Sequence, residues 1–408
     1  MTSEVPRVTL ADIEAARDEH RPGVVVRTPL EESRWLSGAV GSPVFLKCEN
    51  LQRAGSFKIR GAYVRMARLS AEERAHGVVA ASAGNHAQGV ALAAQQLGIR
   101  ATVFMPVGAP IPKEKATRGY GADVRFVGTT IDEGLVSARE FAAETGAVLV
   151  HPFDHADIVA GQGTCGLEIL EQCPEVKTVV VPLGGGGLLA GVATAVKTLN
   201  PEVRVVGVQA ERAAAYPASL AAGHPVALER MTTMADGIAV GRPGEVPFAA
   251  ISEYVDDVVT VSEESMSTAL LMLLERAKMV VEPAGAAAVA AMLDAPETFE
   301  GPVVTVLSGG NIDPVLLMAV IRQGMASAGR YLSFRARISD RPGGLAQLLT
   351  ELAEAGVSVL DVVHARTSVQ LHLDEVEVAL QVETRGPEHS ESLLAQLRQA
   401  GYPLTLQG

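Results

Sequence analysis

The chain has 408 residues, of which 48% are hydrophobic and 20% are charged, and its formal net charge at pH 7 is −13. This length predicts two or three domains, and the composition excludes an intrinsically disordered chain. The acidic balance argues against nucleic acid as a partner, because a polyanion attracts basic proteins.

The sequence shows no pattern of a signal peptide or a membrane span. The first 16 residues are polar, and the most apolar stretch, 280–293, is too short to cross a bilayer and contains Glu282. The three cysteines cannot all pair and lack metal-ligand spacing, which is typical of reduced structural thiols: Cys48, Cys165 and Cys173. We therefore expect a cytoplasmic protein with no membrane contact and no metal site.

From about residue 43 to residue 311, short β-rich runs alternate with Ala-rich helical stretches. The predicted strands are 44–46, 78–81, 101–105, 124–127, 148–151, 178–181, 203–208 and 303–307. The clearest predicted helices are 85–97, 131–145 and 188–198. Continuous apolar strands, each followed by a turn and a helix, indicate an α/β fold with parallel sheets covered on both faces. We assign residues 1–321 to this domain.

The pattern changes at 322–330, a run of small and polar residues that we interpret as a linker. Beyond it the predicted order is strand 331–338, turn 339–343, helix 344–355, strands 357–366 and 376–383, helix 388–400 and a short last strand. Leucines recur on one face of the first of these helices: Leu345, Leu348, Leu349 and Leu352. This βαββαβ order predicts a ferredoxin-like domain at 331–408.

Four segments of the α/β domain lie where a predicted strand ends and a helix begins. They are 56–58, 82–86, 184–188 and 308–311. Ligands of open parallel sheets bind at the carboxyl ends of the strands, so we expect these four segments to meet around one cleft.

Lys58 is the reactive residue of the first segment. It follows Phe57 and has small and apolar neighbours, which favour the neutral amine. A neutral amine can form a Schiff base with a carbonyl cofactor. The alternative is a surface lysine without a chemical role.

The third segment is the clearest signal for a phosphate. A loop of four glycines that opens a helix can turn its N–H groups toward an anion without obstruction by side chains: Gly184, Gly185, Gly186 and Gly187, before Leu188. A glycine-rich turn without a ligand is one alternative. Another is a dinucleotide fingerprint, since 185–190 fits G-x-G-x-x-A and Glu211 follows the next strand, which would indicate a nicotinamide-dependent oxidoreductase. That alternative gives Lys58 no role, whereas a cofactor with a single phosphate uses all four segments.

Five motifs, taken together and in order, closely resemble the threonine/serine dehydratases, pyridoxal-phosphate enzymes that share the tryptophan synthase β-subunit fold. The motifs are SFKIRGA at 56–62, SAGNHAQG at 82–89, GGGGL at 184–188, EPAGA at 282–286 and SGGN at 308–311. The resemblance implies a fold-type II architecture with two lobes, each an open parallel sheet covered by helices, and places the smaller lobe at roughly 72–150. It also implies pyridoxal 5′-phosphate as the cofactor.

The same resemblance implies how the cofactor is held. Lys58 would carry it as a Schiff base and then move the α-proton of the substrate, Phe57 would pack beside the ring, and the glycine loop from Gly184 to Leu188 would cradle the phosphate. Asn85 would donate to the ring hydroxyl and Ser308 would hydrogen-bond the ring nitrogen. A hydroxyl at this position leaves the nitrogen neutral, which suits β-elimination.

The N–H groups at the start of the second helix would bind the substrate carboxylate: Ser82, Ala83, Gly84, Asn85 and His86. Other polar residues of the motifs have simpler interpretations. His86 is typical of a packing residue, Arg60 of a structural ion-pair partner, and Glu282 of a residue that caps or braces a helix.

The implied reaction converts L-threonine into 2-oxobutanoate and ammonia, with the β-hydroxyl leaving with help from the cofactor phosphate. A serine-preferring dehydratase is the alternative, because one methyl group changes binding by only about 1–3 kcal/mol. Ala83 stands where serine racemases have a second serine as a base, so we do not expect racemisation. Glu211 lacks the following acid of the cation-binding relatives, so we expect no metal there.

Residues 331–408 resemble an ACT-type regulatory domain, with 340–345 as the ligand-loop signature. The resemblance implies allosteric control by an amino acid, with isoleucine suited to a role in isoleucine biosynthesis, and a homo-oligomer, either dimer or tetramer. A domain that only aids assembly is the alternative. A non-catalytic amino-acid sensor is disfavoured, because Lys58 and its companions are all present.

Overall fold

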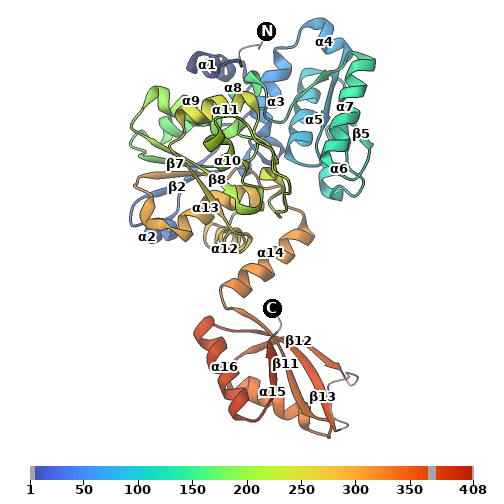
Figure 1. Cartoon of the computed structure of the whole chain (residues 1–408), viewed down its shortest axis with the longest axis vertical. Helices are drawn as coiled ribbons and strands as arrows, with labels where there is room; N and C mark the ends of the chain where they lie inside the picture. The colour runs from blue at the N-terminus through green and yellow to red at the C-terminus, as the bar shows by residue number, and fades with distance from the viewer. Residues whose placement is uncertain (1–4, 366–373, 407–408) are drawn as a thin grey trace. The chain divides into compact units, whose positions relative to one another are not determined.

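The computed structural model describes residues 5–365 and 374–406 (Figure 1). The chain divides into two compact units, Met1–Leu317 and Met318–Gly408. Each unit has a buried hydrophobic core of its own.

The larger sheet of the first unit consists, from one edge to the other, of β1 (Leu30–Glu32), β2 (Val44–Lys47), β10 (Val303–Val306), β7 (Thr178–Pro182), β8 (Arg204–Ala210) and β9 (Asp257–Val261). β1 pairs antiparallel with β2, and the other neighbours are parallel. Every residue of β7 and β10 is buried. The predicted parallel sheet with two covered faces is therefore confirmed, although β1 and β9 were not predicted.

Helices cover both faces of this sheet. One layer contains α1 (Leu10–Glu19), α8 (Ala156–Gln172), α9 (Gly187–Leu199) and α11 (Glu245–Tyr254), and the other contains α2 (Arg34–Val40), α12 (Glu263–Met272) and α13 (Pro283–Asp294). Figure 1 shows α8, α9 and α11 on one side of the strands and α2, α12 and α13 on the other. α9 packs on β7 and β8 from the first side, and α13 packs on the strands from β7 to β10 from the second.

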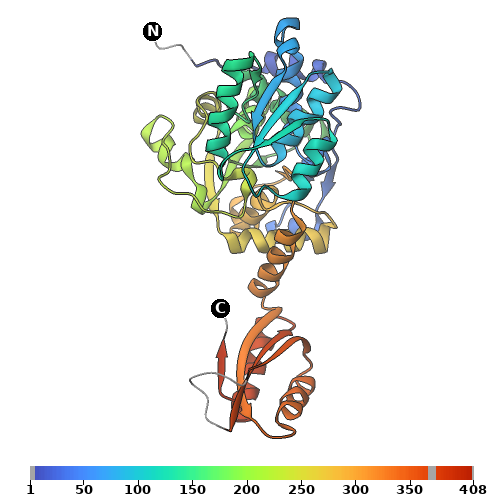
Figure 2. The same cartoon turned by 90° about the vertical axis from the view of Figure 1, so that its right-hand side faces the viewer.

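The second sheet of this unit is entirely parallel, in the order β5 (Asp123–Phe126), β4 (Ala101–Met105), β3 (Val78–Ala81) and β6 (Val148–Leu149). Its helices are α3 (Lys58–Ala67), α4 (Ala71–His76), α5 (Asn85–Leu97), α6 (Ile111–Gly119) and α7 (Ile131–Thr145). Figure 2 brings these strands and helices to the front. α7 packs on β3 and β4, whereas α5 packs on the same strands and on α3. The sheet falls within 72–150, the range predicted for the smaller lobe.

Shorter elements complete the first unit: 3-10 turns at Glu49–Leu51, Arg53–Gly55, Glu211–Ala213, Asp236–Ile238 and Pro296–Thr298, the helix α10 (Ala215–Ala222) and a π-helical turn at Leu273–Ala277. β6 is shorter than the predicted strand 148–151, because the ring Nδ1 of His151 accepts a hydrogen bond from the Asp154 N–H (2.8 Å) and the chain turns there.

The segment 322–330, interpreted as a linker, is helical for most of its length. Helix α14 (Pro314–Ser327) crosses the division between the two units. Gly329 has a φ of 64° and ends the helix, and the Arg330 N–H donates to the Met325 carbonyl (2.8 Å). Small residues such as alanine favour a helix as much as a loop, which is why composition alone did not reveal it.

The second unit contains β11 (Tyr331–Ser339), α15 (Gly344–Glu354), β12 (Ser358–Ala365), β13 (Glu375–Glu383), α16 (Pro387–Gln399) and β14 (Leu404–Leu406). The strands form an antiparallel sheet in the order β12-β13-β11-β14. This is the predicted ferredoxin-like arrangement. The predicted strand 357–366 ends at Arg366, which lies outside the described residues.

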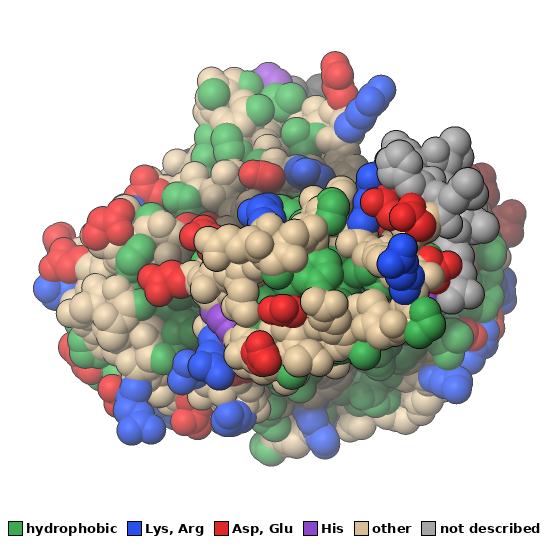
Figure 3. Space-filling model, turned by 90° about the horizontal axis from the view of Figure 1, so that it is seen from below, with side chains coloured by type: hydrophobic (Ala, Val, Ile, Leu, Met, Phe, Trp, Pro, Cys, Tyr) green, Lys and Arg blue, Asp and Glu red, His purple; other side chains and the backbone are tan. Residues whose placement is uncertain are grey.

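Figure 3 shows acidic and basic side chains interspersed over the face that it draws. Within residues 5–365 and 374–406, no helix is long and apolar enough to span a bilayer.

Candidate active site

Lys58 lies beside the end of β10, although the two are far apart in the sequence. Ser56 and Gly309 form an isolated antiparallel bridge. The Phe57 N–H donates to the Ser308 carbonyl (3.2 Å), and the Gly310 N–H donates to the Gly55 carbonyl (2.9 Å). The first and fourth predicted segments are therefore held together by backbone hydrogen bonds.

The Lys58 side chain is partly buried in the first turn of α3. Its Nζ donates to the carbonyl of Pro152 (3.0 Å) and lies 5.1 Å from the centre of the Phe57 ring. Burial lowers the pKa of Lys58 to about 8, and the negative charge of Glu282 opposes this shift only in part. The amine is thus neutral much more often than an exposed lysine at the same pH, as a nucleophile or base requires.

Asn85 joins the second segment to the fourth. Its Nδ2 donates to Oε1 of Glu282 (2.5 Å), and its Oδ1 accepts a hydrogen bond from Nδ2 of Asn311 (2.8 Å). The amide carries two hydrogens, so one of them stays available to a ligand. Glu282 is the N-cap residue of α13, but its side chain makes no cap hydrogen bond and contacts Asn85 instead. Glu282 therefore occupies the expected N-cap position and its carbonyl accepts from the Gly285 and Ala286 N–H groups, but its side chain contacts Asn85 and does not cap the helix.

Glu282 and Ser308 are buried polar groups in this cluster. Burial raises the pKa of Glu282, against the positive charge of Lys113, so its carboxyl holds a proton more readily than an exposed one. Only 4% of Ser308 is exposed. Its carbonyl is used by Phe57, but within the described part of the chain no group hydrogen-bonds its hydroxyl. A hydroxyl that has no protein partner can donate a hydrogen bond to a ligand or accept one from it.

The second segment runs from the end of β3 into α5. The Ser82 N–H continues the sheet by donating to the Phe104 carbonyl (3.0 Å), and the Ser82 Oγ accepts from the Gly84 N–H (3.1 Å). The first-turn N–H groups of a helix have no intrahelical acceptor and can bind an anion. His86 Nε2 donates to the Val150 carbonyl (2.8 Å), and burial lowers the pKa of its ring to about 3. His86 is therefore a neutral packing residue, as interpreted from the sequence.

The glycine loop follows β7 and opens α9. A side chain at Gly185 would overlap the ring of Phe153, and Gly186 has a φ of 100° that L-residues rarely adopt. The Gly185 carbonyl accepts hydrogen bonds from the Tyr216 hydroxyl (3.2 Å) and the Gly244 N–H (3.3 Å). The loop thus packs closely against its neighbours and opens α9, whose first N–H groups can bind an anion. Tyr216 had no sequence signal.

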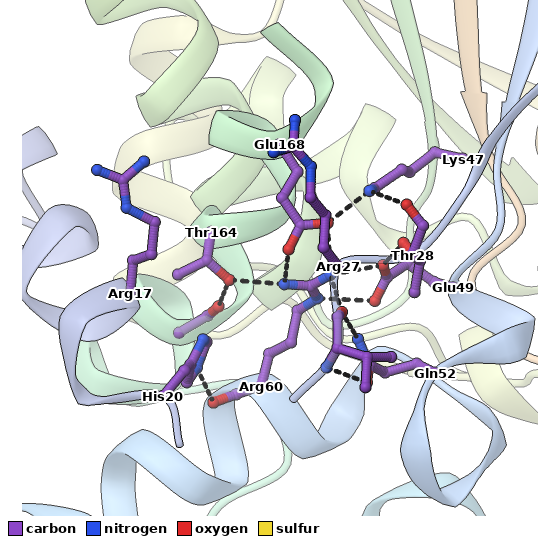
Figure 4. Close-up of polar contacts among 12 residues, drawn as sticks. Arg17, His20, Arg27, Thr28, Lys47, Glu49, Gln52, Arg60, Thr164 and Glu168 are labelled. Carbon is purple, nitrogen blue, oxygen red and sulfur yellow. Dashed lines mark hydrogen bonds and ion pairs between the residues drawn. The ribbon is translucent and has the colours of Figure 1, made fainter. Parts of the chain in front are cut away.

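Arg60 anchors the helix that begins at Lys58. It is fully buried, and its guanidinium binds Glu49 through two hydrogen bonds of 2.8 Å and Glu168 through bonds of 2.7 and 3.0 Å (Figure 4). Figure 4 also shows Lys47 beside Glu168. The Nζ of Lys47 donates to the Thr28 carbonyl (2.9 Å). The interpretation of Arg60 as a structural ion-pair partner is confirmed, with its acidic partners on α8 and on the turn between β2 and α3.

The four predicted segments thus lie at the carboxyl ends of β3, β7 and β10 and at the start of α3, within one unit. Glu211, which the dinucleotide alternative needed, lies in the 3-10 turn after β8, and its Oε1 is 3.9 Å from Nε of Arg212. Lys58, Asn85 and Ser308, which this alternative left without a role, lie in the segments that hydrogen bonds of Phe57, Gly310 and Asn311 hold together.

Comparison with known proteins agrees with this arrangement. Residues 23–309 match the model of the pyridoxal-phosphate dependent enzyme family, and residues 332–401 match the ACT domain. A Thermotoga maritima protein named L-threonine ammonia-lyase is 47% identical over 401 residues, which cover 98% of this chain and 100% of that protein.

Two solved structures are similar to more than three quarters of the chain. The processed form of threonine deaminase isoform 2 from Solanum lycopersicum is 39% identical with a TM-score of 0.73, covering 77% of this chain and 92% of that one. Maize serine racemase is 36% identical with a TM-score of 0.73, covering 79% and 99%. The site geometry and the match over 23–309 lead to one conclusion: the chain belongs to the pyridoxal-phosphate-dependent enzymes and carries a C-terminal ACT domain.

Proposed function

We propose that the chain is a threonine ammonia-lyase, which converts L-threonine into 2-oxobutanoate and ammonia. The observation that carries the proposal is the partly buried Lys58 amine, with its pKa lowered to about 8, at the point where the predicted segments meet. The name of the Thermotoga maritima relative, similar over nearly the whole chain, supports threonine as the substrate.

The residues present fit pyridoxal 5′-phosphate. Lys58 offers a neutral amine for the carbonyl carbon, and the unpartnered Ser308 hydroxyl offers a hydrogen bond to the ring nitrogen. Asn85 has one remaining amide hydrogen for the ring hydroxyl. The loop from Gly184 to Leu188 offers N–H groups at the start of α9 for the phosphate. Phe57 packs beside Lys58 and against the core of the larger sheet.

The proposed reaction depends on a base that removes the proton from the α-carbon of the substrate. Pyridoxal phosphate, when bound, withdraws electrons from the substrate α-carbon and so makes its proton acidic. Lys58 then takes that proton through its neutral amine: the Cα–H bond breaks and an N–H bond forms. Lys58 then returns this proton to the β-hydroxyl as the Cβ–O bond breaks, so that water leaves. Hydrolysis of the remaining enamine gives 2-oxobutanoate and ammonia. The N–H groups of Ala83, Asn85 and His86 hold the substrate carboxylate, because those of Ser82 and Gly84 already donate to the Phe104 carbonyl and to the Ser82 hydroxyl.

The preference between threonine and serine is the finer part of the proposal. Measuring kcat/KM for both amino acids decides it, and we expect the larger value for L-threonine. Racemisation is a second candidate, because maize serine racemase is similar in fold and sequence. Ala83 has no exchangeable side-chain proton, so we expect no D-serine from L-serine and no D-allothreonine from L-threonine. The proposal fails if the purified protein releases no 2-oxobutanoate, or if Lys58→Ala keeps full turnover.

We further propose that the unit containing β11 to β14 binds a small amino acid and changes the activity of the first unit. The ACT match at 332–401 supports this, and isoleucine and valine are the effectors to test. Coupling between such sites is typically about 1–3 kcal/mol. Removing the residues after Arg330 should preserve turnover and abolish the effector response, whereas an unchanged response would refute the proposal. A homo-oligomer, a cytoplasmic location and a role in isoleucine synthesis belong to the same proposal.

A further inference from the structure

Lys113 is a buried cation that the proposed reaction does not yet use. It lies in the first turn of α6, and only 9% of its surface is exposed. Within the described residues no group accepts a hydrogen bond from its ammonium. Its one ion pair there, with Oδ2 of Asp236, spans 3.8 Å, and 68% of the Asp236 side chain is exposed. A buried ammonium normally has closer partners, because removing it from water is costly.

The ammonium of Lys113 lies over the segment that starts α5. A Cβ added at Gly84 would lie 3.8 Å from Nζ of Lys113, and, apart from its chain neighbours, it would meet no other described atom within 4 Å. The space beside Gly84 is therefore open except for this ammonium. Gly84 lies in the middle of the segment Ser82 to His86, three of whose N–H groups are proposed to hold the substrate carboxylate.

The charges around this space favour an anion. Lys113 stands at the N-terminus of α6, and Gly84 is the N-cap residue of α5, so two helix starts contribute positive potential. His86 is neutral, and burial raises the pKa of Glu282 against the positive charge of Lys113, so this carboxyl repels an anion less than an exposed carboxylate would. Asp236 is the negative group paired with Lys113, and its exposed carboxylate can be solvated by water instead.

We propose that the ammonium of Lys113 binds the α-carboxylate of the amino-acid substrate, exchanging its long contact with Asp236 for a closer one. The inference rests on the proposed function, since it names a further substrate-binding residue of the same site. Lys113 makes the same contact before and during the reaction, so it contributes mainly to substrate affinity.

The test uses the cofactor-loaded protein and three variants. Lys113→Met removes the charge at nearly constant length, Lys113→Arg keeps the charge, and Lys115→Met is the matched control, because Lys115 is exposed two residues further along α6. A hydrogen-bonded charge pair of this kind corresponds to about a 10- to 100-fold change in affinity. We expect Lys113→Met to raise KM for L-threonine by that factor with a smaller change in kcat, Lys113→Arg to recover part of it, and Lys115→Met to match the wild type.

A binding measurement separates this inference from the proposed function and from a merely structural role. L-2-aminobutyrate and its amide, which lacks the carboxylate, are titrated while the cofactor absorbance is followed, without any need for turnover. Lys113→Met should weaken binding of the acid and leave the amide unchanged, with an unaltered melting temperature and cofactor content. Equal weakening of both ligands, or of neither, overturns the role of Lys113. An absence of threonine turnover in the wild type overturns the proposed function instead.

Discussion

Replacing Arg60 by methionine should strongly destabilise the first unit. Arg60 and Glu49 are both fully buried, and the guanidinium makes two hydrogen bonds to that carboxylate. Without Arg60, Glu49 keeps only an uncharged partner, the hydroxyl of Thr28, whereas Glu168 keeps a charged partner, the ammonium of Lys47. The variant therefore has one buried carboxylate without a paired charge, which costs about 3–5 kcal/mol.

The assay is urea unfolding followed by the fluorescence of Trp35, the single tryptophan of the chain, which lies in α2 of the same unit. Arg242→Met is the matched control, because Arg242 forms an exposed pair with Glu245 and its loss should change the unfolding free energy by less than about 0.5 kcal/mol. A loss below about 1 kcal/mol in Arg60→Met would refute the reasoning, since it would mean that the buried charge is solvated or moves.

The loss of unfolding free energy in Arg60→Met should also depend on pH in a definite direction. In the wild type burial raises the pKa of Glu49, but the charge and hydrogen bonds of Arg60 outweigh it and leave the pKa below its ordinary value. That stabilisation is present above the unfolded-state pKa and is lost as the pH falls through the lower folded-state value. In Arg60→Met the charge of Arg60 no longer opposes the effect of burial, so the pKa of Glu49 rises. The loss of unfolding free energy relative to the wild type should therefore be smaller at pH 5 than at pH 8. A deficit that grows toward pH 5 would contradict this account.

Two further predictions concern cofactor binding. Gly185→Ala should weaken pyridoxal phosphate binding about tenfold or more, because the new methyl group overlaps the Phe153 ring. Gly38→Ala, in open space on α2, is the control and should leave the affinity unchanged. Titration of the cofactor-free protein measures both affinities, and equal values would contradict the role of the loop. The rate of cofactor uptake should increase as the pH rises, because Lys58 loses its proton, and should level off once the pH is above about 8. A rate that still increases beyond pH 10 would indicate a lysine with an unperturbed pKa.

The sequence predicted the elements that carry strong local signals. The helices Asn85–Leu97 and Ile131–Thr145 have the predicted bounds, because apolar spacing, a following glycine and, for the second, a threonine capping box mark their ends. β9 was missed because two of its five residues are exposed and its pattern is weak for a strand of a parallel sheet. β1 has three residues, too few to show any period.

The sequence predicted those parts of the candidate site that strand ends and local motifs determine. It did not predict contacts between side chains that are far apart in the sequence. Glycines and strand ends located the Lys58 cluster, since parallel strands bring their carboxyl ends to one edge. The contact of Glu282 with Asn85 joins residues 197 positions apart, and nothing local distinguishes it from a helix cap. Lys113 lies in a polar helix beside other charged residues, so only the fold shows that it is buried.

The most direct test of the account is to locate the amine that carries the cofactor. The protein loaded with pyridoxal phosphate is reduced with borohydride, digested, and its peptides are measured by mass spectrometry, with Lys58→Ala treated in parallel. The account predicts that the added mass lies on Lys58, that the variant gains none, and that the reduced protein no longer releases 2-oxobutanoate from L-threonine. Added mass on a different lysine, or full activity after reduction, would contradict it.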